Sequence, residues 1–388
     1  MRIESILERE RVVAASMPWG RLAPFADSLP DLGSRDARLG LRHGRALGRR
    51  ARAAALVVIA CTSASLGAAA ARAPWPDGLL VYDHVVIVVE ENKDYEELIG
   101  SPAAPYLDAL KAEGASFTQM YAEEHYSEGN YFWLFSGSNQ GVGFGDRVPT
   151  EPITASNLGA ELIRSGRSFK GYSEDLPNIG STEHFAGLYT RGHVPWISFG
   201  NVPNGSSPSD SSNLQWRNFP ADYSTLPTVS FVIPNLVHDM HEGSIPGNIA
   251  AGDAWLRTHL DSYLRWARQH DSLLIVTFDE SHHGIDGPTD PAAPEWEMRN
   301  RIPTLFCGAH VRHGAYAEGA GITHVNILRT LESMYGLPRS GAQQPNALRA
   351  GIADDLIVTD VFDALPTGRA HPDSSGRPPR HGRRSVSP

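Results

Sequence analysis

Three short apolar segments of this sequence each lead within six residues to one or more carboxylates, and two of them also to histidines. The groups are Glu90, Glu91 and Asn92, then His238, Asp239 and His241, and finally Asp279, Glu280, His282 and His283. Carboxylates gathered in one place repel one another, and a divalent cation relieves that repulsion. Mixed oxygen and nitrogen donors suit zinc, manganese or iron, whereas calcium or magnesium would require oxygen to dominate. These residue types predict a divalent metal centre and leave the identity of the metal open.

No single one of these groups is strong evidence. An aspartate at a strand end is commonly a helix cap or a loop residue, and the histidines are typical of surface loops, as are His310 and His313. The prediction depends on three strand ends agreeing.

Ser127 is the candidate nucleophile. It precedes an apolar run with helical character, where a serine is ordinarily an N-cap. The start of a helix also favours a phosphate anion, through its free N–H groups and its dipole. A serine at that position can be ionised by a bound metal and attack phosphorus.

The elements that must position these residues alternate along the chain. Strands are expected at 85–89, 168–172, 228–233, 272–278 and 303–307, and helices at 105–113, 157–165, 253–268, 325–335 and from about residue 130. This order predicts an α/β fold with a mostly parallel sheet and helices on both faces, with the site at the carboxyl ends of the strands. Segment 178–222, rich in Gly, Pro, Ser and Asn, is expected to lie over the surface as a lid.

Taken together, the motifs resemble the bacterial phosphoesterase family of acid phosphatases and phosphatidylcholine-type phospholipases C, within the alkaline phosphatase superfamily. The resemblance spans residues 80–340 and rests above all on 84–92 (HVVIVVEEN), 127–141 (SEGNYFWLFSGSNQG), 226–241, 273–280 and 324–332. It implies an alkaline-phosphatase-like three-layer sandwich. The order of the stretches, more than any one of them, is specific.

The resemblance also implies a role for each matching residue. Glu91 and Asn92 match metal and phosphate residues, Ser127 matches the nucleophile, and Asp279 and Glu280 match an acidic metal pair. Further site residues, for a second metal, the phosphate or proton transfer, are Asp239, His241 and His324. Asp253 matches a family motif as well, although a helix N-cap accounts for it equally.

Two departures from the family pattern bear on substrate choice. Gly129 replaces the usual proline of the nucleophile loop and loosens it. Phe132 and Trp133 stand where smaller residues are common, and are expected to narrow the site.

The predicted function is metal-dependent hydrolysis of phosphomonoesters, as in acid phosphatases. A phospholipase C acting on phosphodiesters is the alternative, but no lipid-binding domain follows the catalytic region. A non-catalytic exported binding protein on the same fold is the rival from another class. Sulfatase chemistry is disfavoured, because Ser127 does not lie in a Cys-x-Pro-x-Arg type of motif.

Composition narrows the partners. A formal net charge of −10 does not favour nucleic acid, so the expected partner is a small phosphorylated substrate without an obligate protein partner. Two cysteines, Cys61 and Cys307, predict no disulfide, since the first lies in the export segment.

The ends of the chain are expected to lie outside the fold. Residues 1–73 contain an arginine-rich stretch, a short apolar run and small residues, which together indicate an export signal. Either Cys61 carries a lipid, which would be the only membrane contact, or cleavage follows Ala73. Residues 74–365 are expected to form the catalytic domain, and 366–388 a disordered basic tail.

Overall fold

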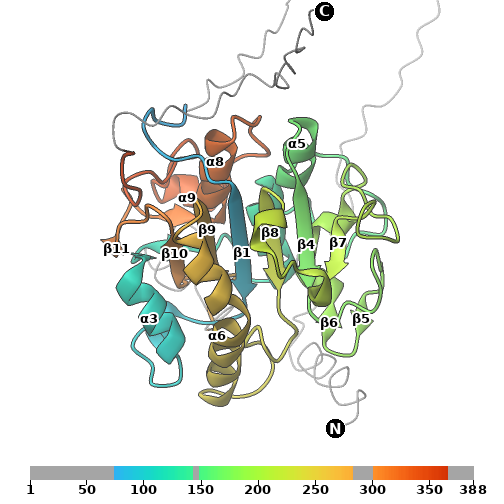
Figure 1. Ribbon diagram of the computed structural model, residues 1–388, viewed down its shortest axis with the longest axis horizontal. Helices are drawn as coiled ribbons and strands as arrows, with labels where there is room; N and C mark the ends of the chain where they lie inside the picture. Colours follow the sequence, from blue (N-terminus) through green and yellow to red (C-terminus); the bar gives the residue numbers. More distant parts are fainter. Residues whose placement is uncertain (1–73, 143–147, 283–299, 366–388) are drawn as a thin grey trace, which may run out of the picture. The chain divides into compact units, whose positions relative to one another are not determined.

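The computed structural model describes residues 74–142, 148–282 and 300–365. The strands of its main sheet are β1 (His84–Glu90), β2 (Ala115–Phe117), β4 (Phe169–Ser173), β7 (Asn213–Gln215), β8 (Val229–Ile233), β9 (Ser272–Phe278), β10 (Thr304–Gly308) and β11 (Gly314–Tyr316). They lie in the order β11-β2-β10-β9-β1-β8-β4-β7 (Figure 1). All run parallel except β10, which is antiparallel to both of its neighbours.

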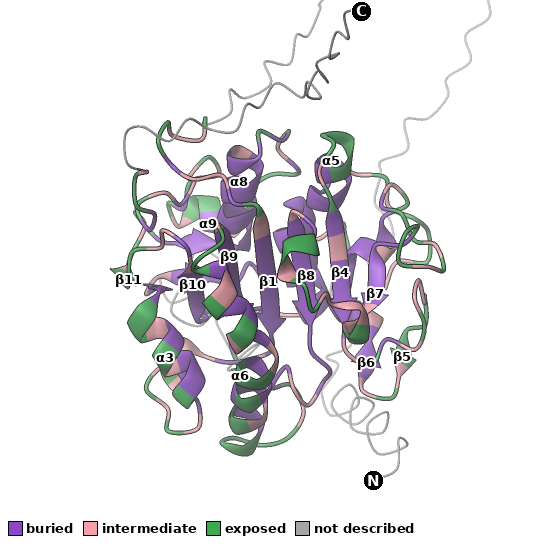
Figure 2. Ribbon diagram, viewed as in Figure 1, coloured by how far each residue is buried: buried purple, intermediate pink, exposed green. Residues whose placement is uncertain are grey.

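The central strands form because they are apolar and β-branched on both faces. In β1 the run from Val85 to Glu90 is buried throughout, and Ile87 pairs with Phe231 of β8 on one side and Ile275 of β9 on the other. A strand buried on both faces requires a layer of helices on each side of the sheet. Figure 2 shows the central strands buried along their length.

Helices supply those two layers. Helices α3 (Pro105–Glu113) and α6 (Gly247–Ala267) contact each other and pack against β9 and β10. A second group, α4 (Ser127–Ser136), α5 (Leu158–Arg164) and α8 (His324–Met334), is joined through contacts of α4 with both α5 and α8, and α5 packs against β4. The predicted α/β fold, with a mostly parallel sheet covered by helices on both faces, is confirmed.

Shorter elements complete the described part of the chain. They are α2 (Tyr95–Leu98), α9 (Pro345–Arg349), β3 (Met120–Tyr121) paired with β12 (Ile322–Thr323), β5 (Phe185–Ala186) paired with β6 (Tyr189–Thr190), and the 3-10 turns η1 (Arg191–His193), η2 (Pro195–Ser198), η3 (Trp216–Asn218) and η4 (Tyr223–Thr225). Within the described ranges, no helix combines the length and the apolar character needed to span a bilayer.

Two helix starts differ from the prediction. Helix α4 begins at Ser127 itself, and α6 begins at Gly247, before Asp253. Asp253 therefore does not cap its own helix. Its carboxylate accepts the backbone N–H groups of Tyr106 and Leu107, at 3.1 and 2.8 Å, and so caps the neighbouring helix α3.

The prediction that segment 178–222 lies over the surface as a lid is wrong for β7 and η2. Strand β7 from this segment forms the edge of the main sheet, and Trp196 of η2 is 1% exposed. The indole lies against Phe169 and Phe231 at ring distances of 5.9 Å. Gly and Pro frequency correctly indicated irregular backbone, but the few large apolar residues within it are part of the core.

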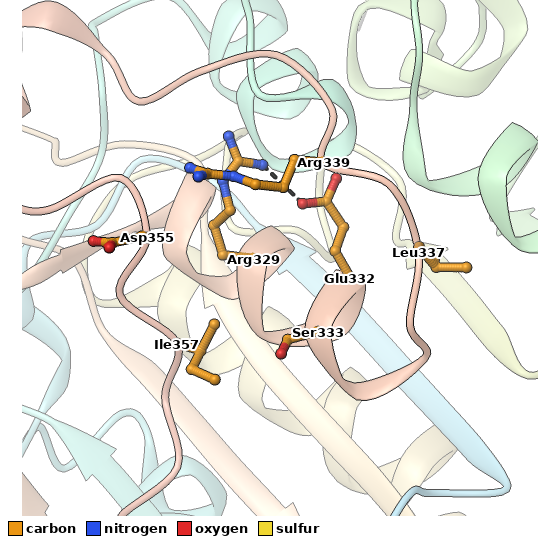
Figure 3. A pocket seen from close by; sticks show the side chains of 7 residues that line it. All are labelled: Arg329, Glu332, Ser333, Leu337, Arg339, Asp355 and Ile357. Carbon is orange, nitrogen blue, oxygen red and sulfur yellow. Dashed lines mark hydrogen bonds and ion pairs between the residues drawn. The ribbon is translucent and has the colours of Figure 1, made fainter. Parts of the chain in front are cut away.

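A small pocket at the carboxyl end of α8 lies away from the predicted site (Figure 3). Its buried Arg329 pairs with Glu332 at 2.8 Å and with Asp354 at 3.0 Å. Nearby, the Tyr335 hydroxyl donates to the Tyr82 carbonyl, just before β1, so this pocket is near the amino end of that strand. The paired charges identify it as a structural anchor for α8.

Candidate active site

The three acidic strand ends meet at one edge of the sheet. The Glu91 N–H donates to the Asp239 carbonyl at 2.7 Å, which joins the ends of β1 and β8. The Asn92 N–H donates to Oδ1 of Asp279 at 2.9 Å, which joins the ends of β1 and β9. The structure thus brings Glu91, Asn92, Asp239 and Asp279 together, because parallel neighbouring strands end at the same edge.

Glu91 is the centre of this cluster and is fully buried. Its Oε2 accepts the Ser127 hydroxyl at 3.0 Å and the Asn92 side-chain amide at 2.8 Å. Its Oε1 accepts the Tyr131 hydroxyl at 2.5 Å and lies 3.4 Å from Nε2 of His193. The predicted nucleophile is therefore in direct contact with the predicted metal residue after the first strand.

Burial and negative neighbours make this carboxylate unusual. Burial raises the pKa of Glu91 well above its ordinary value, and the nearby charges of Asp279 and Asp239 raise it further. The hydrogen bond from Tyr131 acts in the opposite direction. A cation bound here would offset the repulsion between these carboxylates.

The donor set fits a divalent cation. Glu91, His193 and Asp239 each offer one ligand atom, and these atoms lie within 4.8 Å of one another. Asp239 Oδ2 and Asp279 Oδ2 are buried without a hydrogen-bond donor in the described parts of the chain. Buried carboxylate oxygens without donors are costly unless a cation or water satisfies them. An imidazole with two or three carboxylates is the donor chemistry of zinc, manganese or iron sites.

Ser127 occupies the first position of α4 and is 7% exposed. The loop before it is held by Glu280, whose Oε2 accepts the Tyr126 N–H at 2.6 Å and the Asn130 side-chain amide at 3.2 Å. Glu280 thus lies at the start of α4. The start of α4 is the place where the sequence predicted that a phosphate would bind.

The two predicted catalytic histidines lie in different surroundings. The His241 side chain is 40% exposed, and its ring centre lies 6.2 Å from that of His193. Burial acts to lower the pKa of His241, but Glu242 and Asp239 outweigh it, and the pKa is raised above 6.5. An accessible imidazole with a raised pKa is suited to donate a proton.

His324 is enclosed, and the structure does not bring it to the open side of the site. It is 1% exposed, its Nδ1 lies 2.6 Å from Oε2 of Glu123, and its Nε2 lies 2.7 Å from the Phe278 carbonyl. Both ring nitrogens are therefore engaged. Because Phe278 precedes Asp279, the contact between His324 and the Phe278 carbonyl fixes the end of β9.

The two departures in the nucleophile segment have structural explanations. A Cβ at Gly129 would lie 1.8 Å from the Glu124 carboxylate, so the absence of a side chain makes room for Glu124, which accepts the Asn139 side-chain amide at 3.0 Å. Phe132 is fully buried and packs against Phe199 at 5.8 Å. The expectation that Phe132 narrows the site is wrong, because its ring points into the core.

Sequence reasoning missed His193 and Tyr131. His193 lies in the irregular segment, where no periodicity marks a lone histidine. Tyr131 is four residues after Ser127, so a helix starting at Ser127 places both on one face, and this signal was available. The rings of Tyr131 and His193 stack with their centres 5.1 Å apart and an interplanar angle of 8°, which positions the imidazole beside Glu91. Of the other predicted loop histidines, His282 lies at 2.9 Å from Glu97, and His283 falls outside the described residues.

The fold and this cluster define a hydrolase of phosphate esters, and the sequence comparisons agree. The profile of the Phosphoesterase family matches residues 101–338, and the chain belongs to that family. A phosphatidylinositol-3-phosphatase of Mycobacterium tuberculosis is 46% identical over 292 residues, which are 74% of this chain and 90% of that protein. A probable acid phosphatase of Kluyveromyces lactis is 26% identical over 287 residues, covering 71% of this chain and 63% of that protein.

Among solved structures, the similarity is more distant. A protein of the alkaline phosphatase superfamily from Vibrio parahaemolyticus superposes with a TM-score of 0.46 at 14% identity, covering 68% of this chain and 72% of that one. The family profile and the Mycobacterium tuberculosis relative confirm the predicted family membership and the assignment as a phosphoesterase.

Proposed function

We propose that this protein is an exported, divalent-metal-dependent phosphatase that uses Ser127 as its nucleophile on phosphomonoesters. The observation that carries the proposal is the 3.0 Å hydrogen bond from the Ser127 hydroxyl, at the start of α4, to the buried carboxylate of Glu91. A serine that only capped its helix would direct its oxygen to the amides of its own first turn. Here the hydroxyl faces the acidic cluster.

The cation would be held by Glu91, Asp239, Asp279 and His193, with Glu280 and Ser127 beside them. When bound, it would lower the pKa of the serine and neutralise charge on the phosphoryl oxygens. The oxygens of Asp239 and Asp279 that lack donors support this assignment.

The chain's own groups then account for the reaction. Ser127 Oγ attacks phosphorus in line, and its proton passes to Oε2 of Glu91, which it already faces. The Asn92 amide and the N–H groups of α4 stabilise negative charge on the phosphoryl oxygens. The P–O bond to the leaving group breaks, and that oxygen takes a proton from His241. Water then attacks the phosphoserine and gives one proton to His241. The bond from phosphorus to Ser127 Oγ breaks, and that oxygen takes back the proton held by Glu91.

The substrate we favour is a membrane lipid carrying a phosphomonoester, of the phosphoinositide 3-phosphate type. The Mycobacterium tuberculosis relative is named for that activity, and the similarity covers most of both chains. A phospholipase C acting on diesters is the second candidate. A non-catalytic binding role is disfavoured, because Ser127, Glu91, Asn92, Asp279 and Glu280 are all present and clustered.

The test compares substrates and metal states of the purified full chain. Hydrolysis of p-nitrophenyl phosphate, bis-p-nitrophenyl phosphate, and vesicles of phosphatidylinositol 3-phosphate or phosphatidylcholine is measured before and after chelation. We expect monoester turnover that disappears with the metal and returns when one divalent ion is added back. Turnover confined to the diesters would establish the phospholipase alternative, and turnover that survives complete chelation would refute metal dependence.

A further inference from the structure

Lys93 is a buried cation next to the proposed metal residues, and the mechanism above does not use it. Lys93 as a whole is 2% exposed. The ammonium donates to the main-chain carbonyls of Asn92 at 2.8 Å and of Met240 at 3.0 Å, and the Glu91 carbonyl lies at 3.4 Å. A buried ammonium is costly unless its three donors are satisfied, and here main-chain oxygens of two separate loops satisfy them.

Those two loops carry Glu91 and Asp239, which are proposed metal ligands. Each loop also has an unfavourable backbone conformation at one residue. Asn92, with φ of 52°, follows Glu91, and Met240, with φ of 76°, lies between Asp239 and His241. Non-glycine residues rarely adopt positive φ, so the surrounding structure must hold them there. The Lys93 ammonium is bound to the carbonyl of each of these two residues, and so fixes both peptides at once.

We propose that Lys93 is a positioning residue that fixes the end of β1 against the loop after β8, and thereby sets the spacing of the Glu91 and Asp239 donors. The 2.7 Å bond from the Glu91 N–H to the Asp239 carbonyl joins the same two loops directly. From the other side, the Asn248 side-chain amide in α6 donates to the Met240 carbonyl at 2.9 Å. The proposal rests on the proposed metal-dependent function.

A purely electrostatic role of Lys93 predicts a change in cation affinity opposite to that of a positioning role. The acidic neighbours of Lys93 include Glu91, Asp239 and Asp279. If the ammonium acted only through its charge, removing it would leave the cluster more negative and strengthen cation binding. If it positions the two loops, removing it lets the donors separate and weakens cation binding. The sign of the change in metal affinity therefore distinguishes the two roles.

The test compares Lys93→Met, which keeps the aliphatic stem, with Lys93→Gln, which keeps a neutral donor, and with Lys111→Met, a control at a half-buried lysine in α3. We measure the Kd for Mn²⁺ by titration calorimetry, kcat and KM at saturating Mn²⁺, and amide hydrogen exchange of residues 238–242 without metal. For Lys93→Met we expect a Kd weakened about tenfold, equivalent to about 1.4 kcal/mol. We also expect a lower kcat with KM within about twofold, and faster exchange at 238–242.

Lys93→Gln should fall between Lys93→Met and the wild type, and the control should match the wild type. An unchanged or tighter Kd in folded Lys93→Met would overturn the proposal. If the wild-type protein bound no Mn²⁺, the metal proposal would fail by itself, and the exchange data would still decide, since unchanged exchange at 238–242 contradicts positioning. If Lys93→Met does not fold, Asn248→Ala should shift Kd and exchange in the same direction but less, and no shift would overturn the proposal.

Discussion

A serine hydroxyl is a weak nucleophile unless its surroundings activate it, so the role proposed for Ser127 depends on the side chains around it. Glu91 accepts a hydrogen bond from the Ser127 hydroxyl, while hydrogen bonds from Asn92 and Tyr131 hold the Glu91 carboxylate in place. Each of these contacts comes from a different position along the chain, so each can be removed separately. The loss of each hydrogen bond therefore has its own predicted effect on activity.

Replacing Tyr131 by Phe removes the 2.5 Å hydrogen bond to Glu91 and keeps the ring that stacks on His193. Hydrogen bonds to charged groups contribute about 1.5–3 kcal/mol, so kcat/KM for p-nitrophenyl phosphate should fall by about tenfold or more. Tyr189→Phe is the matched control, because that hydroxyl is buried without a hydrogen-bond partner in the described structure. Equal activity of the two variants would show that Tyr131 does not orient Glu91.

His324 predicts a pH-dependent stability. Burial alone acts to lower its pKa, but Glu123 and the Phe278 carbonyl outweigh burial and raise the pKa above 6.5. A histidine whose pKa is raised on folding stabilises the fold fully below pH 6.5, and this stabilisation is lost as pH rises through the folded-state pKa. His324→Gln should therefore lower the free energy of unfolding by about 3 kcal/mol at pH 6, and by less at pH 9.

Urea unfolding of both proteins at the two pH values measures that difference. His310→Gln serves as the control, since His310 is partly exposed and lies 3.3 Å from Asp271. A loss of stability that is equal at pH 6 and pH 9 would contradict a charged His324.

At the scale of elements, the strand ends explain how much of the site was predictable. The apolar runs of β1, β8 and β9 mark strands buried on both faces, and parallel neighbours must end at one edge. Glu91, Asp239 and Asp279 therefore converge as expected. His193 could not be predicted in the same way, because η1 belongs to an irregular segment whose path is set by tertiary packing and not by local pattern.

That path depends on Gly171 of β4. A Cβ at this position would lie 2.0 Å from Cζ2 of Trp196, the indole that anchors the segment carrying His193. Gly171→Ala should therefore lower the free energy of unfolding by about 1–3 kcal/mol through overpacking, measured by urea denaturation. Gly247→Ala is the control, because a Cβ there meets nothing within 4 Å. If Gly171→Ala is as stable as the control, Trp196 does not depend on close contact with β4.

At the scale of the whole molecule, fold and site are coupled through the buried negative charge at one edge of the sheet. The fold must hold Glu91, Asp239 and Asp279 together against their mutual repulsion, and a bound cation would remove part of that cost. The general architecture followed from alternating strands and helices. The buried hydrogen bonds of Lys93, Glu123 and Asn130 could not be predicted in this way, because hydrogen bonds between distant segments leave no periodic pattern in the sequence.

Metal binding should therefore stabilise the entire fold. At a free Mn²⁺ concentration 100 times its Kd, linkage adds about 2.7 kcal/mol to the free energy of unfolding, and Tm rises accordingly. Differential scanning calorimetry with and without chelator measures the effect. Asp239→Asn should show a smaller rise, because it weakens one donor of the site. A Tm that is independent of divalent ions in the wild-type protein would contradict the metal assignment.

The most direct test of the account is the turnover of Ser127→Ala with p-nitrophenyl phosphate at saturating divalent metal. Ser136→Ala is its matched control, because Ser136 lies at the far end of the same helix and is also buried. We expect Ser127→Ala to lose about a thousandfold or more of kcat, while Ser136→Ala stays near the wild-type rate. Full turnover by Ser127→Ala would contradict the covalent route and leave Ser127 as no more than the first residue of α4.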